Sequence, residues 1–176
     1  MGKIRPPEDV ALFIATLYSK VEYFEKAVDI LKEEYGDILF KSHPYRWDYS
    51  TYYNKELGYP VIRQFIFFEK LINPQFLPDI KIRTNEIEDI LSIEGKRQIN
   101  LDPGYITLSK VVLASTKNYA HRLYLGKGVY GEVTLIFREK TYQPHIFTYK
   151  DYQDKTCLDM FNNIREAIKD RLKEKR

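Results

Sequence analysis

The stretch VALFIATLYSKVEYFEKAVDILKEEYG, residues 10–36, decides the fold class. Residues 10–18 form a continuous apolar run rich in strand formers, which predicts a buried strand. Ser19 with Glu22 three residues later matches a capping box, so we expect a helix to begin there, and Gly36 supplies its stop. The apolar residues of this helix recur at helical spacing along one face: Val21, Phe24, Val28, Leu31 and Tyr35.

Two more strands and a second helix follow. Residues 37–43 and 61–71 read as strands, and the second of them is apolar on both faces. Asn73, followed by proline, opens a helix that runs to about Ser92. Its other face carries a polar stripe that we interpret as solvated: Lys81, Asn85 and Glu88. Residues 98–101 start the next strand, which completes the βαββαβ order of ferredoxin-like domains.

The C-terminal half predicts an extension of this sheet. Strands near residues 110–114, 121–125 and 129–137 are separated by short connections, which favours antiparallel hairpins. Residues 154–176 keep a helical apolar stripe to the end. The fold class is therefore α+β, a ferredoxin-like core extended by antiparallel strands and a terminal helix. Residues 1–176 suit one domain.

Composition narrows the class of protein. Charged residues at 30% and apolar residues at 44% are typical of a globular protein. The apolar run that starts at Val10 is too short for a membrane span, and with Cys157 alone no intramolecular disulfide is possible, so we expect a cytoplasmic protein. Abundant Lys, Glu and Ile suggest a thermophilic source.

Residues 96–138 carry most of the positive charge. Seven Lys or Arg stand against Asp102 and Glu132, which gives a local net charge of +5 in a chain of net charge +3. A solvated basic face and an anion-binding site are both consistent with this excess. A second unusual segment, residues 44–60, holds five tyrosines without any period, and we expect a long ordered loop.

Gly126, Gly128 and Gly131 match a GxGxxG phosphate-binding pattern. The dinucleotide fold requires a helix after these glycines, but residues 132–137 read as a strand. A kinase loop is excluded because the later catalytic motifs are missing. We therefore interpret the motif as a tight hairpin turn.

Strand alternation groups polar side chains on one sheet face. If the two hairpin strands are in register, the face combines Arg122, Tyr124, Tyr130, Glu132 and Thr134, and Asn100 with Asp102 joins from the preceding strand. The predicted ligand-binding residues are Arg97, Asn100, Lys117, Arg122, Tyr124, Tyr130 and Thr134. The alternative is an exposed sheet face with a cross-strand Arg–Glu pair, which contributes under about 1 kcal/mol.

Any catalytic residue is unknown, and the acid–base candidates are Glu132, Asp102 and His121. Alternation places His121 on the apolar face, so a structural histidine is favoured. Asp102 begins Asp-Pro-Gly, which predicts a turn. We predict no metal site, because no metal-ligand spacing is present, and the pattern implies no particular cofactor.

Short motifs along almost the whole chain resemble a bacterial family, the domain of unknown function 4416 family. They are RPP at 5–7, TYYNKELG at 51–58, FFEKLI at 67–72, IKIRTNEIE at 80–88, KRQINLDPGY at 96–105, STKNYAHRLYLGKGVYGEVTL at 115–135 and TYKDY at 148–152. Leu57 and Lys150 stand where Met and Pro are more usual in that family. The resemblance implies relatives but transfers no activity.

Three functions follow from these patterns. The leading hypothesis is a protein that binds a small anionic ligand, phosphorylated or nucleotide-like, on a sheet face, with Arg97, Lys117 and Arg122 as anion contacts. The second is an RNA-binding module on a tyrosine-rich sheet. The third is a scaffold that binds a partner through residues 44–60. The pattern leaves open whether the protein is an enzyme.

Overall fold

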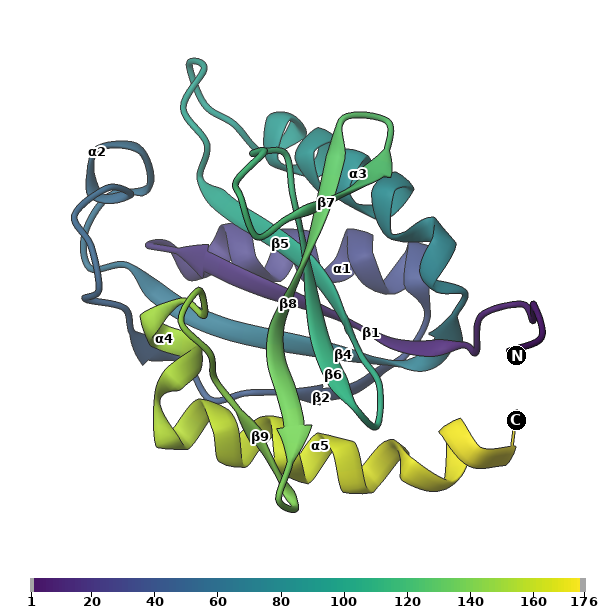
Figure 1. Cartoon of the computed structure of the whole chain (residues 1–176). Helices are drawn as coiled ribbons and strands as arrows, with labels where there is room; N and C mark the ends of the chain where they lie inside the picture. Colours follow the sequence, from purple (N-terminus) through teal and green to yellow (C-terminus); the bar gives the residue numbers. More distant parts are fainter. Residues whose placement is uncertain (1, 175–176) are drawn as a thin grey trace.

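A computed structural model of the chain describes residues 2–174, with side chains over residues 2–172. The fold is α+β, with one antiparallel sheet and five α-helices in this part of the chain (Figure 1). The strands are β1 (Val10–Tyr18), β2 (Ile38–Lys41), β3 (Tyr45–Arg46), β4 (Ile62–Ile72), β5 (Ile99–Ile106), β6 (Lys110–Ser115), β7 (Leu123–Gly126), β8 (Val129–Arg138) and β9 (Thr141–Gln143). The helices are α1 (Val21–Tyr35), α2 (Asn54–Leu57), α3 (Leu77–Ile90), α4 (Lys150–Gln153) and α5 (Lys155–Glu174).

β1 lies inside the sheet, whose strand order is β2-β4-β1-β5-β6-β8-β7. β3 pairs with β4, and β9 pairs with β8. All nine residues of β1 are buried, because its neighbours are strands on both edges and helices on both faces. This is why the run from Val10 to Tyr18 is apolar without alternation.

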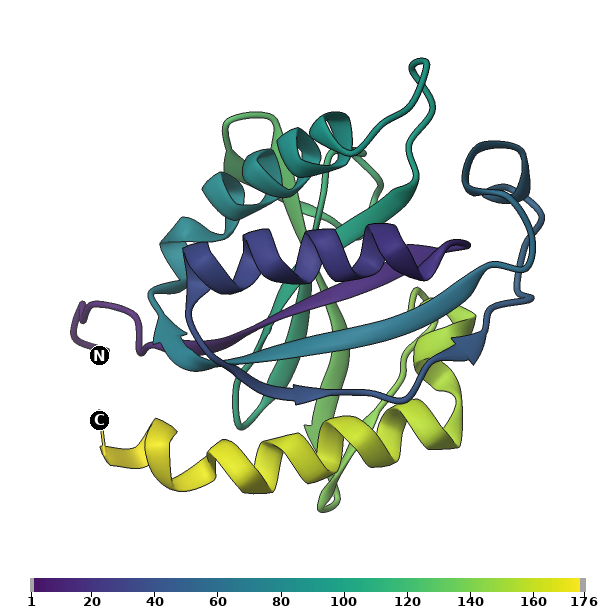
Figure 2. The same ribbon diagram turned by 180° about the vertical axis from the view of Figure 1, so that it is seen from behind.

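The two faces of the sheet have separate cores. Leu12 and Ile14 of β1 pack with α1 and α3, which run across the face in front in Figure 2. Phe13 and Ala15 point the other way and pack against Phe161 and the rest of α5. The chain thus forms three layers, with the sheet between two layers of helices.

The ends of α1 agree only partly with the prediction. The helix begins at Val21 after Lys20, and no side chain caps it, so the predicted capping box of Ser19 and Glu22 is wrong. Val21 is exposed, and the buried face is instead built from Tyr23, Phe24, Ala27, Val28 and Leu31. Gly36 ends the helix with a φ of 91°, as expected.

The entry to α3 follows the predicted cap. Asn73 accepts a hydrogen bond of 3.0 Å from the amide of Gln75, and Pro74 opens a 3₁₀ turn that leads into α3. The loop predicted at residues 44–60 contains the short elements β3 and α2, and we refer to residues 44–60 as the Tyr-rich segment.

The C-terminal strands pair as antiparallel neighbours, as predicted. Gly126 and Gly128 have φ values of 110° and 76° in the β7–β8 hairpin, where the motif was interpreted as a turn. β9 and α4 were not predicted. The terminal helix was expected over residues 154–176, of which the last two lie outside the described residues.

The predicted turn at Asp102-Pro103-Gly104 is wrong, because all three residues lie within β5. Gly104 is needed there for close packing. A Cβ at this position would lie 2.5 Å from the carbonyl oxygen of Val112 and 2.6 Å from Cζ of Phe13. Within residues 2–174, no helix has both the length and the apolar character that crossing a membrane requires.

Candidate functional site

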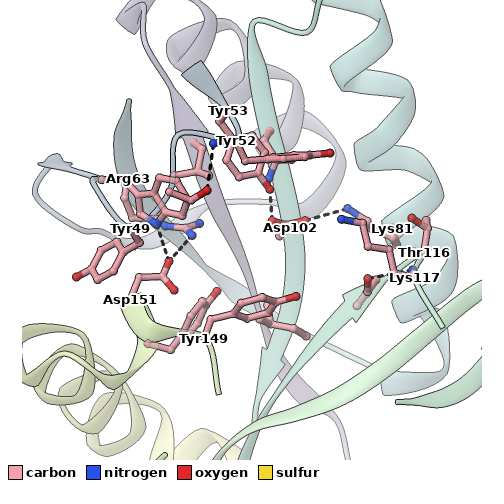
Figure 3. A pocket seen from close by; sticks show the side chains of 18 of the residues that line it. Tyr49, Tyr52, Tyr53, Arg63, Lys81, Asp102, Thr116, Lys117, Tyr149 and Asp151 are labelled. Atoms are coloured by element: carbon pink, nitrogen blue, oxygen red, sulfur yellow. Dashed lines mark hydrogen bonds and ion pairs between the residues drawn. The ribbon is translucent and has the colours of Figure 1, made fainter. Parts of the chain in front are cut away.

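A cavity of about 700 Å³ lies where the Tyr-rich segment, α3 and the start of α4 meet the sheet. We call it the Asp102 pocket. Figure 3 shows Asp102 on β5 between Arg63 with Asp151 on one side and Lys81 with Lys117 on the other. Its polar and charged lining comes from strands and helices far apart in the sequence, so the pocket exists only in the folded chain.

The pocket forms where the sheet opens. β5 and β6 pair only over Gly104–Ile106 with Leu113–Val111, so the first half of β5 has no strand neighbour on that side. Side chains of α3 take the place of the missing strand. Glu88 accepts a hydrogen bond of 2.5 Å from the amide of Leu101, and Lys81 donates one of 3.1 Å to the carbonyl of the same residue. Buried backbone groups require such partners.

Lys81 also fixes Asp102. Its Nζ lies 3.1 Å from Oδ1 of Asp102, and Asn100 donates to Oδ2 over 2.7 Å. Burial alone would raise the pKa of Asp102, but the charges of Lys81 and Arg63 and these two hydrogen bonds lower it below its ordinary value. With 34% of its side chain exposed, Asp102 presents an ionised carboxylate to the pocket.

Arg97 holds the Tyr-rich segment against the sheet. Its Nε and Nη2 each lie 2.7 Å from an oxygen of Glu56 in α2, a bidentate pair. Nη1 donates to Glu88 over 2.9 Å and to Asn100 over 3.0 Å. Burial raises the pKa of Glu88, although the charge of Lys81 and the hydrogen bonds from Arg97 and Leu101 oppose this effect. Arg97 therefore lines the pocket with its hydrogen-bonding groups largely occupied.

Arg122 and Glu132 form a buried pair at the opposite wall. The two side chains are only 1% and 2% exposed, and Arg122 Nε lies 2.6 Å from Glu132 Oε2. The Arg122 guanidinium also donates to Ser115 Oγ, the carbonyl of Lys117 and the Tyr149 hydroxyl. Oε2 of Glu132 also lies 3.0 Å from Nε2 of His121. Oε1 of Glu132 makes no hydrogen bond within the described part of the chain.

A second buried pair lines the pocket. Arg63 and Asp151 are 6% and 4% exposed, and the Asp151 carboxylate also accepts a bond of 2.9 Å from Trp47 Nε1. Arg63 lies against the rings of Trp47, Phe65 and Tyr152. These contacts join the Tyr-rich segment to α4.

Aromatic rings form much of the remaining wall: Trp47, Tyr49, Tyr52, Tyr53, Tyr149 and Tyr152. Tyr52 is 66% exposed, and Lys117 Nζ lies 5.5 Å from the centroid of its ring. A mouth of this kind offers flat apolar surface beside a positive charge.

The lining charges are mostly paired with one another. The pocket is lined by six basic and five acidic residues. Four cation–carboxylate pairs lie among them: Arg63–Asp151, Lys81–Asp102, Arg97–Glu88 and Arg122–Glu132. Three charged groups have no ion pair within residues 2–172: Lys117, Lys150 and Asp89. The net charge available to a ligand is therefore positive.

A family model described as "Domain of unknown function (DUF4416)" matches residues 8–167. The chain belongs to this family. A comparison with curated proteins and another with solved structures find no match. The family match confirms the resemblance seen in the motifs. Those motifs contain many of the side chains that line the pocket of this family member, although Trp47 and Arg63 lie outside them.

The structure brings six of the predicted site residues to the pocket of this DUF4416 protein: Arg97, Asn100, Asp102, Lys117, Arg122 and Glu132. They do not share an open sheet face, because three of them lie in or beside loops and the others on β5 and β8.

Four predicted residues lie outside the pocket lining. Tyr124 and Tyr130 pair with each other at the β7–β8 edge. Thr134 is fully buried, and the β6–β8 register shift skips it, so it does not line the pocket. His121 precedes β7, so the alternation argument does not apply to it. It contacts Glu132 and stacks on Phe147 at 4.5 Å, not on the apolar side as expected.

Sequence reasoning missed the contribution of α3. The stripe of Lys81, Asn85 and Glu88 was interpreted as solvated, yet all three line the pocket, and Lys81 and Glu88 are 6% and 4% exposed. Arg63 and Asp151 were also missed, because nothing in the sequence pairs residues so far apart. The available signal was that α3 places lysine, asparagine and glutamate at helical spacing beside buried isoleucines.

Within residues 2–174, no group of three or more His, Cys, Asp or Glu side chains is placed to hold a metal ion. Burial raises the pKa of the Cys157 thiol, which makes it a poor nucleophile. The chemistry that the pocket offers is hydrogen bonding, charge and aromatic contact.

Proposed function

We propose that the Asp102 pocket binds a small anionic ligand, phosphorylated or nucleotide-like. The observation that carries the proposal is the pairing of charges in the pocket. Four lining cations are neutralised by carboxylates, while Lys117 and Lys150 have no carboxylate partner within the described side chains. Two lining lysines whose charge is not balanced by a carboxylate there attract and hold an anion.

The size and walls of the pocket support a small organic ligand. A cavity of about 700 Å³ falls in the range of small-molecule sites, about 300–1,000 Å³. Tyr49, Tyr52 and Tyr149 offer exposed ring surface for a planar or sugar group. The ligand site in this proposal is a pocket at an opening of the sheet, and not the flat sheet face first expected.

The contacts assigned to the anion differ from those expected. Arg97 and Arg122 each make four hydrogen bonds within the chain, so they shape the pocket and add positive potential. Lys117 and Lys150 are the proposed anion contacts. The proposal contains no reaction, because Asp102 and Glu132 are each paired with a cation and the Ser115 hydroxyl is engaged by Arg122.

Thermal shift measurements against nucleotides and phosphorylated sugars test this proposal. Phosphorylated compounds that fit the pocket are expected to raise the melting temperature, because a ligand that binds only the folded state stabilises it. Lys117→Ala should abolish most of the rise. Lys127→Ala is the matched control, because Lys127 lies on the β7–β8 hairpin and pairs with Asp79 outside the pocket. Silence across the panel would contradict the proposal.

An RNA-binding module is the main alternative. Such modules stack bases on aromatic residues of an open sheet face. Here Phe13, Phe65 and Phe67 of the face opposite α1 and α3 are buried beneath α5. We therefore favour the small ligand, and tight binding of single-stranded RNA at low salt would reverse this preference. The partner-binding alternative rests on Tyr52 and Tyr59 of the Tyr-rich segment, which are 66% and 60% exposed, and a monomer without a copurifying partner would count against it.

We also propose that β1, α1, β2, β4, α3 and β5 form a ferredoxin-like unit. The strand order β2-β4-β1-β5 and the position of α1 and α3 on the same face support this assignment (Figure 2). A cytoplasmic location is supported by the single cysteine.

A further inference from the structure

Asp102 places a negatively charged carboxylate in the pocket that we propose to bind an anion. A phosphate oxygen placed against its carboxylate would be repelled, yet two side chains of the protein hold this carboxylate in the pocket. Lys81 reaches it through the opening between β5 and β6, and Asn100 binds its second oxygen. Figure 3 shows it between the two charged walls. A ligand that fills the pocket must therefore present a hydrogen-bond donor to Asp102.

The ligand group that donates to Asp102 should be neutral. Lys81 Nζ lies 3.1 Å from Asp102 Oδ1, so the negative charge of the carboxylate is already balanced. A ligand ammonium at the same carboxylate would lie close to Lys81 and be repelled. Each oxygen of Asp102 accepts one hydrogen bond within the chain and has capacity for another. A hydroxyl group uses this capacity without adding positive charge.

Glu132 repeats the arrangement on the opposite wall. Arg122 balances its charge, and both of its hydrogen bonds fall on Oε2. Its Oε1 has no hydrogen-bond donor within the described residues. The pocket therefore combines free ammonium groups on Lys117 and Lys150 with charge-balanced carboxylates that accept hydrogen bonds.

We propose that the ligand of the Asp102 pocket is a hydroxyl-bearing phosphate ester, such as a ribonucleotide or a polyol phosphate, whose hydroxyl group donates to Asp102. This inference rests on the proposed function and makes it more specific. Lys117 and Lys150 receive the phosphate, and Asp102, held by Lys81 and Asn100, selects the hydroxyl.

Titration calorimetry of the full chain with matched ligand pairs tests the inference. One pair is adenosine 5′-monophosphate and its 2′,3′-dideoxy analogue, and the other is glycerol 3-phosphate and n-propyl phosphate. Within each pair the phosphate is the same and only the hydroxyls differ. The hydroxyl-bearing member of at least one pair is expected to bind about tenfold more tightly, as for a hydrogen bond to a charged group. This comparison uses the unmodified protein.

Two variants then locate the effect. Asp102→Asn keeps the shape but loses the charged acceptor, so the tenfold ratio should fall toward one. Asp159→Asn is the matched control, because Asp159 pairs with Lys155 on α5 outside the pocket, and its ratio should stay unchanged. Circular dichroism confirms that both variants fold.

The outcomes separate this inference from the proposed function. Equal affinity within both pairs would overturn the inference while leaving anion binding intact. A ratio that persists in Asp102→Asn would also overturn it, since another residue would then recognise the hydroxyl. If none of the four esters, nor inorganic phosphate, binds at all, the proposed function itself fails.

Discussion

Lys81 of α3 donates to Asp102 of β5 over 3.1 Å, although α3 packs on one face of the sheet and Asp102, opposite Ala15 of β1, projects from the other. The contact is possible because β6 pairs with β5 only from Gly104 onward, which leaves the side of β5 open at Asp102. One lysine thus bonds the Leu101 carbonyl on the open side of β5 and balances the charge of Asp102. Structure and proposed binding depend on the same side chain.

Lys81→Met is expected to lower the free energy of unfolding by about 2 kcal/mol, because it leaves the Leu101 carbonyl and Oδ1 of Asp102 without the donor they share. Methionine keeps the aliphatic stem, so the loss reports the ammonium group. Urea denaturation measures it. Lys117→Met is the control, because Lys117 is exposed and has no ion pair with the side chains of residues 2–172, and a change within about 0.5 kcal/mol is expected there. Equal effects in the two variants would contradict the role given to Lys81.

The pH dependence of Asp102→Asn follows from the lowered pKa of Asp102. A carboxyl whose pKa is lower in the folded than in the unfolded state stabilises fully above the unfolded value, about 3.9, and this contribution is lost as the pH falls through the folded value. The difference in unfolding free energy between the unmodified protein and Asp102→Asn should therefore be largest near pH 7. It should shrink below about pH 4. Denaturation curves from pH 7 to about 2 check this.

Glu88 is expected to change the unfolding free energy with pH in the direction opposite to Asp102. Burial raises its pKa in the folded state, so its ionisation opposes folding, and acidification from neutral pH toward about 4.3 recovers stability. Glu88→Gln should remove this gain. A gain that persists in the variant would mean that another buried acid is responsible.

Gly104→Ala is expected to destabilise the fold by about 3 kcal/mol or more, since the new Cβ would meet backbone and a buried ring. Gly131→Ala is the matched control in β8 of the same sheet. There the Cβ would meet Cδ1 of Leu125 at 2.9 Å, and the partly exposed end of that side chain has room to move, so we expect a loss under about 1 kcal/mol. Thermal unfolding of the two variants distinguishes close packing from a general cost of replacing glycine in a strand.

The order of elements was predictable because local patterns specify it. The apolar run from Val10, the Asn73 cap and the glycine hairpin each depend on neighbouring residues, and each was located from the sequence. The predicted turn at Asp102-Pro103-Gly104 failed because proline and glycine suit a turn in isolation. Here both residues lie within β5, whose pairing with β6 begins only at Gly104.

The pocket was only half predictable for a related reason. Glu132 and Arg122 were grouped correctly, because a hairpin brings residues ten apart into contact. Lys81 and Asp151 reach the pocket through the opening in the sheet and through the packing of α4. Both are consequences of tertiary structure that no local period records. The bulge at Thr134 shows the same limit, since one extra residue reverses a face.

Arg122→Met is expected to lower the free energy of unfolding by about 3–5 kcal/mol, because it leaves the buried Glu132 carboxylate without the cation that balances its charge. The double variant Arg122→Met/Glu132→Met should recover part of this loss, since no unpaired charge remains. Chemical denaturation of the two single variants and the double variant gives the coupling energy. If the double variant loses more unfolding free energy than the two single variants lose together, the charge pair is not the reason for the cost.

Trp47 provides an internal reporter of binding, because it is the only tryptophan in the sequence and its ring lines the pocket and donates to Asp151. A phosphate ester that enters the pocket is expected to change its fluorescence in a saturable way. Lys150→Ala should move the midpoint to about tenfold higher ligand concentration through loss of one charged contact. Lys155→Ala serves as the control, because Lys155 is exposed, pairs with Asp159 and lies outside the pocket. Binding detected by calorimetry without any change in Trp47 emission would place the ligand elsewhere on the protein.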